Sequence, residues 1–366
     1  MKKVTGLNGL GALALLVLLG TACSKPPASV SPSTTGPAPD AAPASTAAPA
    51  PSKIEEARID RWDPAMDAIV PTDWKVEKLA EGFGWAEGPI WVKSGGYLLF
   101  TDVPGNKMWK WSEAGGLEKF LDPSGATAPD MNVWREAGAN GLAILDDNTI
   151  LLADTGNRSI QRLDLATKAK TPVAEKFEGK KFASPNDVAK MKSGVIFFTD
   201  PPYGFKKFDD APEKEIAFNG VYRAGTDGTV TVIEKDLFRP NGVALSPDES
   251  VLYVAQSEPT KAIIMAYTLD ADGKVTGKKL FHDFTDLVAD DAPGLPDGLT
   301  VAEDGTIFTS GPGGVIVLSK DGKRLGRIVD GKPTANCKFG DDGRTLYLTS
   351  KDMLARIRLN VRGAGF

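Results

Sequence analysis

Six polar residues recur along the sequence at positions where their oxygen atoms could act together. Each opens a copy of one short pattern: a polar residue, a strand, a turn, and a second strand that ends on another polar residue. If the fold gathers these residues, their oxygens suit a hard divalent cation, and Ca²⁺ best tolerates several neutral ligands. The set holds two carboxylates and four amides, namely Glu87, Asn140, Asn186, Asn241, Asp297 and Asn336.

The spacing of this pattern predicts the elements that must position these residues. Successive copies begin 53, 46, 55, 56 and 39 residues apart. A unit of that size cannot bury its own apolar face, and such a period is typical of the four-stranded blades of a β-propeller. Short β-prone runs such as residues 97–100 and 195–198 support strands, and no stretch shows a sustained helical period. We therefore expect an all-β, six-bladed propeller over residues 54–366.

In a propeller the first strand of each blade lines a central channel, so the six opening residues should form a ring at one mouth of it. Asn-Gly and Asp-Gly are also common hairpin turns, which leaves turn chemistry as an alternative, above all for Asn140 and Asn336. About fourteen residues later each hairpin should return to the same rim. The returning residues are Asp102, Asp154, Asp200, Gln256, Ser310 and Ser350.

Several motifs in this domain resemble a known family. In order they are GWAEGPIW at 84–91, SPNDV at 184–188, FTDPPYG at 198–204, RPNGVALSPDE at 239–249, LPDGL at 295–299 and TANCKFGDDGRTLY at 334–347. Together they are similar to the gluconolactonase, senescence-marker-protein (regucalcin) and luciferin-regenerating-enzyme family. The resemblance runs over about residues 74–362 and implies a metal-dependent, gluconolactonase-like lactone hydrolase, a carboxylic ester hydrolase, with a small-molecule lactone substrate.

The same resemblance implies roles for individual residues. It assigns Glu87, Asn186, Asn241 and Asp297 as ligands of one divalent metal, with Ca²⁺ expected and Mg²⁺ or Zn²⁺ as alternatives. It gives Asp297 the catalytic role, as base or as nucleophile. A carboxylate that binds a dication is a poor base, so the choice between those roles and a ligand role stays open.

Three further residues are expected to contribute to substrate binding. They are Asn140 from the ring, Asp200 from the returning set and Tyr203 from the Pro-Pro-Tyr-Gly segment, although Tyr203 fits a turn-packing role equally well.

Two departures from the family pattern leave the sugar undefined. Many members read Glu-His-Gly-Asn-Arg where residues 154–158 read Asp-Thr-Gly-Asn-Arg, and animal members have an Arg where Ser184 stands. Other catalytic groups are scarce, because His282 is the only histidine, and we expect it to cap a loop. A Ser-His-Asp triad would require that residue.

Other functions remain open at this point. One is a non-catalytic propeller that binds a partner or ligand and uses Ca²⁺ for structure. Another is a related organophosphate or ester hydrolase. A quinone-dependent sugar dehydrogenase shares the architecture, but the ring lacks the cationic and imidazole groups that such chemistry usually needs.

The N-terminal residues predict export. A basic start and the apolar residues 10–19 precede Cys23, and this segment resembles a bacterial lipobox, so residues 1–23 read as a lipoprotein signal peptide. Residues 24–53 are rich in Pro, Ala, Ser and Thr and predict a disordered tether. We expect a membrane-anchored lipoprotein that faces the periplasm or the cell exterior. Cys337, the other cysteine, should be a buried small hydrophobe.

The overall charge excludes one class of partner. A net charge of −5 without a basic stripe argues against nucleic-acid binding. Membrane contact is expected through the lipid alone, and the domain is expected to be a monomer.

Overall fold

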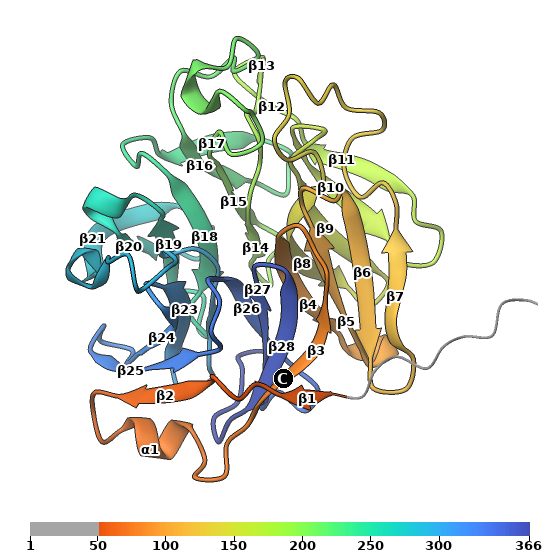
Figure 1. Ribbon diagram of the computed structural model, residues 1–366. Coiled ribbons are helices and arrows are strands. Elements are labelled where there is room, and N and C mark those ends of the chain that lie inside the picture. The colour runs from red at the N-terminus through yellow and green to blue at the C-terminus, as the bar shows by residue number, and fades with distance from the viewer. Residues whose placement is uncertain (1–50) are drawn as a thin grey trace, which may run out of the picture. The chain divides into compact units, whose positions relative to one another are not determined.

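The computed structural model describes residues 51–366, and in that range the fold is almost entirely β (Figure 1). The expected signal peptide, Cys23 and nearly all of the expected tether lie outside the described residues. One α-helix is present in the described part of the chain, α1 (Met66–Ile69), together with four short 3₁₀ turns. Within residues 51–366 no helix is both long and apolar enough to cross a membrane.

Six antiparallel sheets of at least four strands surround a central channel, which confirms the predicted six-bladed propeller. Figure 1 shows β4, β8, β14, β18 and β26 near the centre and β7, β11 and β21 on the outside. The first three blades contain β4 (Ala86–Val92), β5 (Tyr97–Asp102), β6 (Lys107–Ser112) and β7 (Gly116–Leu121); β8 (Ala139–Asp146), β9 (Thr149–Asp154), β10 (Ser159–Asp164) and β11 (Lys170–Ala174); and β14 (Val188–Lys190), β15 (Ile196–Asp200), β16 (Gly220–Ala224) and β17 (Val230–Glu234).

The other three blades follow the same order from the channel outward. Their strands are β18 (Pro240–Leu245), β19 (Val251–Gln256), β20 (Ile263–Leu269) and β21 (Val275–Asp283); β22 (Leu299–Val301), β23 (Ile307–Gly311), β24 (Gly314–Leu318) and β25 (Arg324–Val329); and β26 (Thr334–Gly340), β27 (Thr345–Ser350) and β28 (Met353–Arg358). A separate two-stranded hairpin, β12 (Lys176–Phe177) and β13 (Lys180–Lys181), lies between the second and third blades in sequence.

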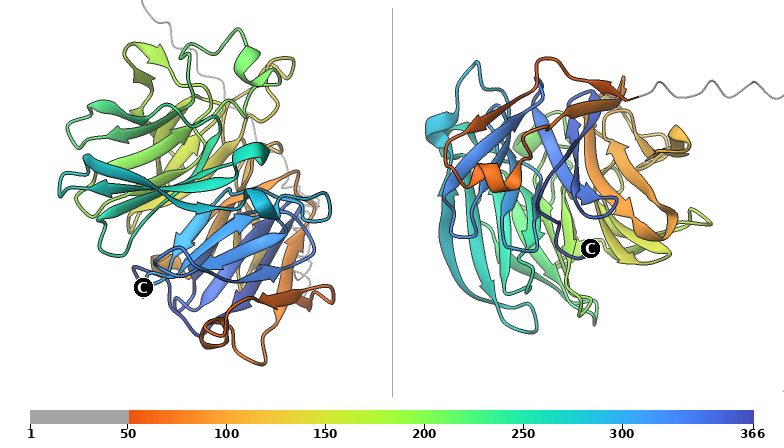
Figure 2. Two further views of the ribbon diagram at one scale, coloured as in Figure 1. Left: turned by 90° about the vertical axis from the view of Figure 1, so that its left-hand side faces the viewer. Right: turned by 90° about the horizontal axis from the view of Figure 1, so that it is seen from below.

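The N-terminal strands close the ring. β3 (Val76–Glu81) pairs antiparallel with β28 and supplies the fourth strand of the last blade, and β1 (Ser52–Lys53) extends it. β2 (Arg58–Arg61) adds a fifth strand to the neighbouring blade through β25. Figure 2 shows this red-orange segment lying against the blue C-terminal strands. The closure covers strand edges that would otherwise stay unpaired.

The core lies between the blades, which explains the apolar runs in the sequence. Each of six hydrophobic clusters fills the space between one pair of neighbouring blades. The second strand of a blade is therefore covered on both faces, as in β27, where every residue is buried. Cys337 belongs to one cluster and is fully buried, as predicted, and burial raises the pKa of its thiol to about 12.

Close approach of the inner strands explains the glycines that follow the ring residues. A Cβ on Gly242 would lie 2.1 Å from the Asp297 carbonyl oxygen, and one on Gly298 would lie 1.9 Å from Cγ of Asn336. Only glycine allows backbones to approach this closely. Asn140 and Asn336 lie inside β8 and β26, so their sequence pattern does not come from hairpin turns.

Candidate active site

A cavity of about 700 Å³ opens where the inner strands begin. Asn336, the sixth residue of the predicted ring, does not line it, but its Nδ2 donates a hydrogen bond to Oε2 of Glu87 at 3.3 Å. Tyr203 and the other five ring residues line this cavity. The five ring residues are Glu87, Asn140, Asn186, Asn241 and Asp297.

Glu87 is a buried carboxylate without a cationic partner among the described residues. Its side chain is 3% exposed, and Oε2 accepts a hydrogen bond from the Gly88 amide at 3.1 Å. Burial raises the pKa of Glu87 to about 8, and the negative charges of Asp187 and Glu136 add to the effect. A carboxylate in this environment is stabilised by a nearby positive charge.

Asp297 faces the same cavity and is partly exposed to it. Its amide donates to Oγ of Ser310 at 3.0 Å, which fixes the backbone before β22. Desolvation raises the pKa of the Asp297 carboxyl well above its usual range, and the charges of Glu87 and Asp187 raise it further. Two carboxylates with raised pKa values in one cavity form a site that favours a cation.

The side-chain amide of Asn241 lines the same cavity as the two carboxylates. Its Nδ2 donates to Oγ of Ser257 at 2.7 Å, and that hydroxyl donates to the Pro296 carbonyl at 2.6 Å. The amide orientation is thereby fixed, and Oδ1 is buried without a hydrogen-bond partner within residues 51–366. A buried unpaired oxygen is costly, so it points to a ligand that the protein itself does not supply.

These donors fit a hard divalent ion. Carboxylate and amide oxygens are the ligand types that Ca²⁺ and Mg²⁺ take. No group of three or more His, Cys, Asp or Glu side chains within residues 51–366 is placed to hold a metal. A metal site here would therefore have to combine the carboxylates of Glu87 and Asp297 with amides.

Asp200, the third residue predicted to bind substrate, does not line the cavity. It is fully buried, and its two carboxylate oxygens accept hydrogen bonds from the amides of Ala183 at 2.8 Å and Ser184 at 2.7 Å. Asp102 holds the amides of Gly84 and Trp85 in the same way. Asp102 and Asp200 thus anchor the loops that lead into the inner strands of their blades.

Tyr203 and Asn140 lie where the sequence placed them, on the cavity wall. Burial raises the pKa of the Tyr203 hydroxyl, and the charge of Asp297, which lines the same cavity, raises it further. Its ring also packs edge-on against Phe208, with centroids 6.5 Å apart. Tyr203 therefore lies on the cavity wall and packs against Phe208, while its role in substrate binding stays a prediction.

His282 lies on β21, the outer strand of its blade, and does not line the cavity. Its Nδ1 is 2.7 Å from the Gly322 carbonyl, and its Nε2 accepts a hydrogen bond from Nε of Arg324 at 2.7 Å. The ring thus holds a loop, as predicted, and no histidine is available for a triad in the cavity.

Five polar or aromatic residues on the cavity wall were not predicted from the sequence: Trp85, Arg135, Glu136, Ser257 and Thr334. Trp85 and Ser257 lie beside residues of the repeat in the sequence, and this position is the signal that could have identified them as cavity residues. Arg135 and Glu136 lie between repeats, in a segment whose pattern gives no sign that it reaches the channel.

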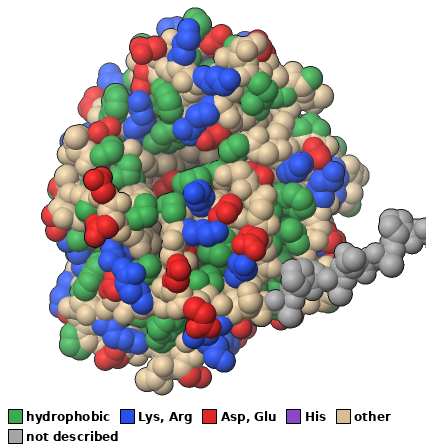
Figure 3. Space-filling model, in the orientation of Figure 1, with side chains coloured by type: hydrophobic (Ala, Val, Ile, Leu, Met, Phe, Trp, Pro, Cys, Tyr) green, Lys and Arg blue, Asp and Glu red, His purple; other side chains and the backbone are tan. Residues whose placement is uncertain are grey.

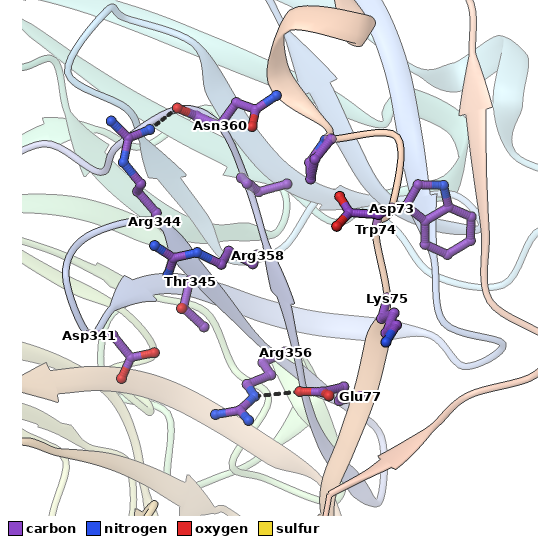
Figure 4. Close-up of a pocket in the computed structure, with 12 residues that line it drawn as sticks. Asp73, Trp74, Lys75, Glu77, Asp341, Arg344, Thr345, Arg356, Arg358 and Asn360 are labelled. Atoms are coloured by element: carbon purple, nitrogen blue, oxygen red, sulfur yellow. Dashed lines mark hydrogen bonds and ion pairs between the residues drawn. The ribbon is translucent and has the colours of Figure 1, made fainter.

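A second cavity of about 640 Å³ lies at the last blade (Figure 4). It is lined by residues from 71–77, from the turn between β26 and β27, and from 356–360 at the end of β28. We call it the outer groove. Figure 4 shows Arg356 pointing toward Glu77, with Nε 2.8 Å from Oε2. Arg358 pairs with Asp342 at 2.6 Å. Two arginines of the outer groove are thus paired with carboxylates of the protein.

The profile of the SMP-30/Gluconolactonase/LRE-like region matches residues 85–352. The chain is 41% identical over 310 residues to the gluconolactonase of Zymomonas mobilis, covering 84% of this chain and 87% of that protein. The gluconolactonase structure from Xanthomonas campestris superposes with a TM-score of 0.72 at 28% identity, over 85% of this chain and 98% of that one.

A regucalcin from Agrobacterium tumefaciens, described as a calcium-binding protein, shares the fold. Its TM-score is 0.60 at 20% identity, over 79% of this chain and 94% of that one. The extent of the profile match and the identity to the Zymomonas protein decide the relationship. This chain belongs to the SMP-30/gluconolactonase/LRE-like family.

Proposed function

We propose that this lactone hydrolase opens sugar lactones at the channel cavity and uses one divalent metal, with Ca²⁺ favoured. The proposed ligands are Glu87, Asn186, Asn241 and Asp297. The observation that carries the proposal is the unpaired Oδ1 of Asn241 in the cavity that holds the two uncompensated carboxylates. The likeness to a gluconolactonase supports the substrate class.

Lactone hydrolysis needs stabilisation of the developing oxyanion, an attacking water and a proton acceptor. A bound dication would supply positive charge at the oxyanion. Asp297 is the proposed acceptor, because its carboxylate faces the cavity and lies near Tyr203. Glu87 is more deeply buried and suits a ligand role.

Direct attack of the Asp297 carboxylate on the lactone carbonyl is the alternative chemistry. A single turnover in ¹⁸O-labelled water detects this alternative when water opens the resulting mixed anhydride at the aspartyl carbon, whereas opening at the substrate carbonyl labels the product as direct attack of water does. If Asp297 accepts a proton from water, the product carboxylate carries the label in the first turnover. If Asp297 attacks and water then opens the acyl-aspartate at the aspartyl carbon, the first product is unlabelled and the label enters the protein.

The activity is tested with purified protein, supplied metal and a lactone panel, with acid release read by a pH indicator. The panel holds five- and six-membered sugar lactones, together with an aryl ester and a phosphotriester. We expect the fastest turnover on a sugar lactone. Preferred turnover of the ester or the phosphotriester would support the related-hydrolase alternative. No turnover of any compound would favour a non-catalytic binding propeller.

We also propose that the protein is an exported lipoprotein anchored through Cys23, on the basis of the N-terminal sequence pattern alone. Cys23→Ser should abolish lipidation, so that the protein is extracted without detergent, while lactonase activity stays unchanged. Mass spectrometry of the N-terminal peptide measures the modification. A wild-type protein that is unmodified at Cys23 and soluble without detergent would contradict the anchor.

A further inference from the structure

A loop between the first and second blades brings two charged side chains to the channel cavity. The amides of Arg135 and Glu136 both donate to the Gly204 carbonyl, at 2.8 and 3.2 Å. Trp134 forms an isolated bridge with Phe205, and their ring centroids are 5.0 Å apart. The loop is thus fixed by backbone hydrogen bonds and by aromatic packing to a segment that follows the third blade's second strand.

Both side chains line the cavity, and they contact each other. Arg135 donates from its guanidinium to the Glu136 carboxylate. The Glu136 side chain is 13% exposed and that of Arg135 is 45% exposed. Glu136 lines the same cavity as Glu87 and Asp297 without being one of the proposed ligands.

The cavity also has apolar surfaces beside these two residues and the polar side chains already described. Trp85, Pro104, Leu295 and Pro333 line it. Such surfaces suit the C–H groups of a sugar ring, but they cannot satisfy its hydroxyls. A carboxylate accepts O–H donors, and a guanidinium donates N–H groups in a fixed fork.

We propose that Glu136 and Arg135 bind the ring hydroxyls of the substrate and select polyhydroxylated lactones over lactones that lack hydroxyls. This inference rests on the proposed function and deepens it by assigning the residues that recognise the substrate. A site that hydrogen-bonds the hydroxyl groups of its substrate discriminates against an analogue without them.

The test compares D-glucono-1,5-lactone with δ-valerolactone, the same ring without hydroxyls. Glu136→Gln keeps the size of the side chain and removes its charge. We expect kcat/KM for the gluconolactone to fall roughly 10- to 100-fold, mostly through KM, as for the loss of a charged hydrogen bond. Turnover of δ-valerolactone should change less than about twofold. Arg135→Lys should shift the ratio in the same direction, because Lys keeps the charge but loses the fork.

Glu118→Gln is the matched control, because Glu118 is an exposed glutamate on β7 that pairs with Lys110. It should leave both substrates unchanged, and thermal melting should show that all variants are folded. Equal losses of Glu136→Gln on both lactones would overturn the inference and place Glu136 in catalysis or ligand positioning. An unchanged ratio for Glu136→Gln would overturn it as well.

A binding measurement separates this inference from the proposed function. By calorimetry, wild type should bind D-gluconate more tightly than 5-hydroxypentanoate, and Glu136→Gln should abolish the difference. If wild type opens no lactone but this preference exists and depends on Glu136, the proposed activity fails and the recognition site stands. If wild type opens lactones and binds both acids equally, the recognition site is wrong.

Discussion

The channel cavity and the outer groove have similar volumes, about 700 and 640 Å³, but a buried carboxylate of the cavity has no cationic partner within residues 51–366, whereas two arginines of the groove are paired with carboxylates. In the outer groove Arg356 is held by Glu77 and by Glu113, each at 2.8 Å. In the cavity Glu87 is buried with no cationic partner in the described chain. Burial of an unpaired charge costs several kcal/mol, so we expect a charged ligand to bind in the cavity and not in the groove.

The surface outside these two regions does not change that contrast. On the face in Figure 3, acidic and basic side chains are interspersed, and no stripe of one sign is visible. This pattern agrees with the mild net charge of −5. The pairing of individual charged residues therefore indicates the functional site better than the net charge of the protein does.

Metal removal should have the largest effect, because it leaves the cavity carboxylates uncompensated. Exhaustive chelation should reduce turnover to background and lower the melting temperature, since an ion bound only by the folded state stabilises it. Ca²⁺ should restore both. Elemental analysis accompanies the assay. Full activity in a sample shown to contain no metal would rule out the proposed metal.

The substitution Asp297→Asn should have the second-largest effect on turnover. The change keeps the shape and one oxygen ligand but removes the proton acceptor, so kcat at saturating metal should fall at least about 100-fold. Asp272→Asn is the control, because Asp272 is 72% exposed and lies on a distant turn. Near-wild-type rates for Asp297→Asn at saturating metal would show that Asp297 is only a ligand and that the base lies elsewhere.

The pH dependence of stability should sharpen the contrast without any assay of turnover. In metal-free protein the pKa of Glu87 is about 8 in the folded state, against 4.5 ordinarily. The folded state therefore holds more protons than the unfolded state between these values, and stability should fall as the pH rises through this window. Asp297 contributes in the same direction.

Glu87→Gln should flatten that fall, measured by urea unfolding of chelated protein at several pH values. Added metal should stabilise wild type more at pH 8 than at pH 5, because the carboxylates must be deprotonated to bind it. Identical pH slopes for wild type and Glu87→Gln would show that Glu87 does not titrate in this way.

Arg358→Ala in the outer groove should have the smallest effect. The Arg358 and Asp342 side chains are 60% and 54% exposed, so their ion pair should contribute less than about 1 kcal/mol to the free energy of unfolding. Lactone kcat/KM should stay within about twofold of wild type. A tenfold loss would mean that the groove takes part in function and that charge pairing does not separate the two regions.

Most of the architecture could be predicted because the repeat is local. The spacing of six polar residues fixed the number of blades, and the first residue of each repeat lies at the start of an inner strand. The five-stranded sheets were not predicted, because β2 pairs with β25 and β3 pairs with β28 near the far end of the chain, β1 extends the sheet through β3, and none of these N-terminal strands carries a repeat signal.

The sequence by itself determined which backbone positions meet at the channel, since strand periodicity sets the register of every blade. Only the tertiary structure decided what each side chain does there. Asp200 and Asp297 both flank repeat strands, yet Asp200 is satisfied by two backbone amides whereas Asp297 faces the cavity. Glu136 reaches the same cavity because its loop is held by Gly204, a contact between distant segments that no local pattern encodes.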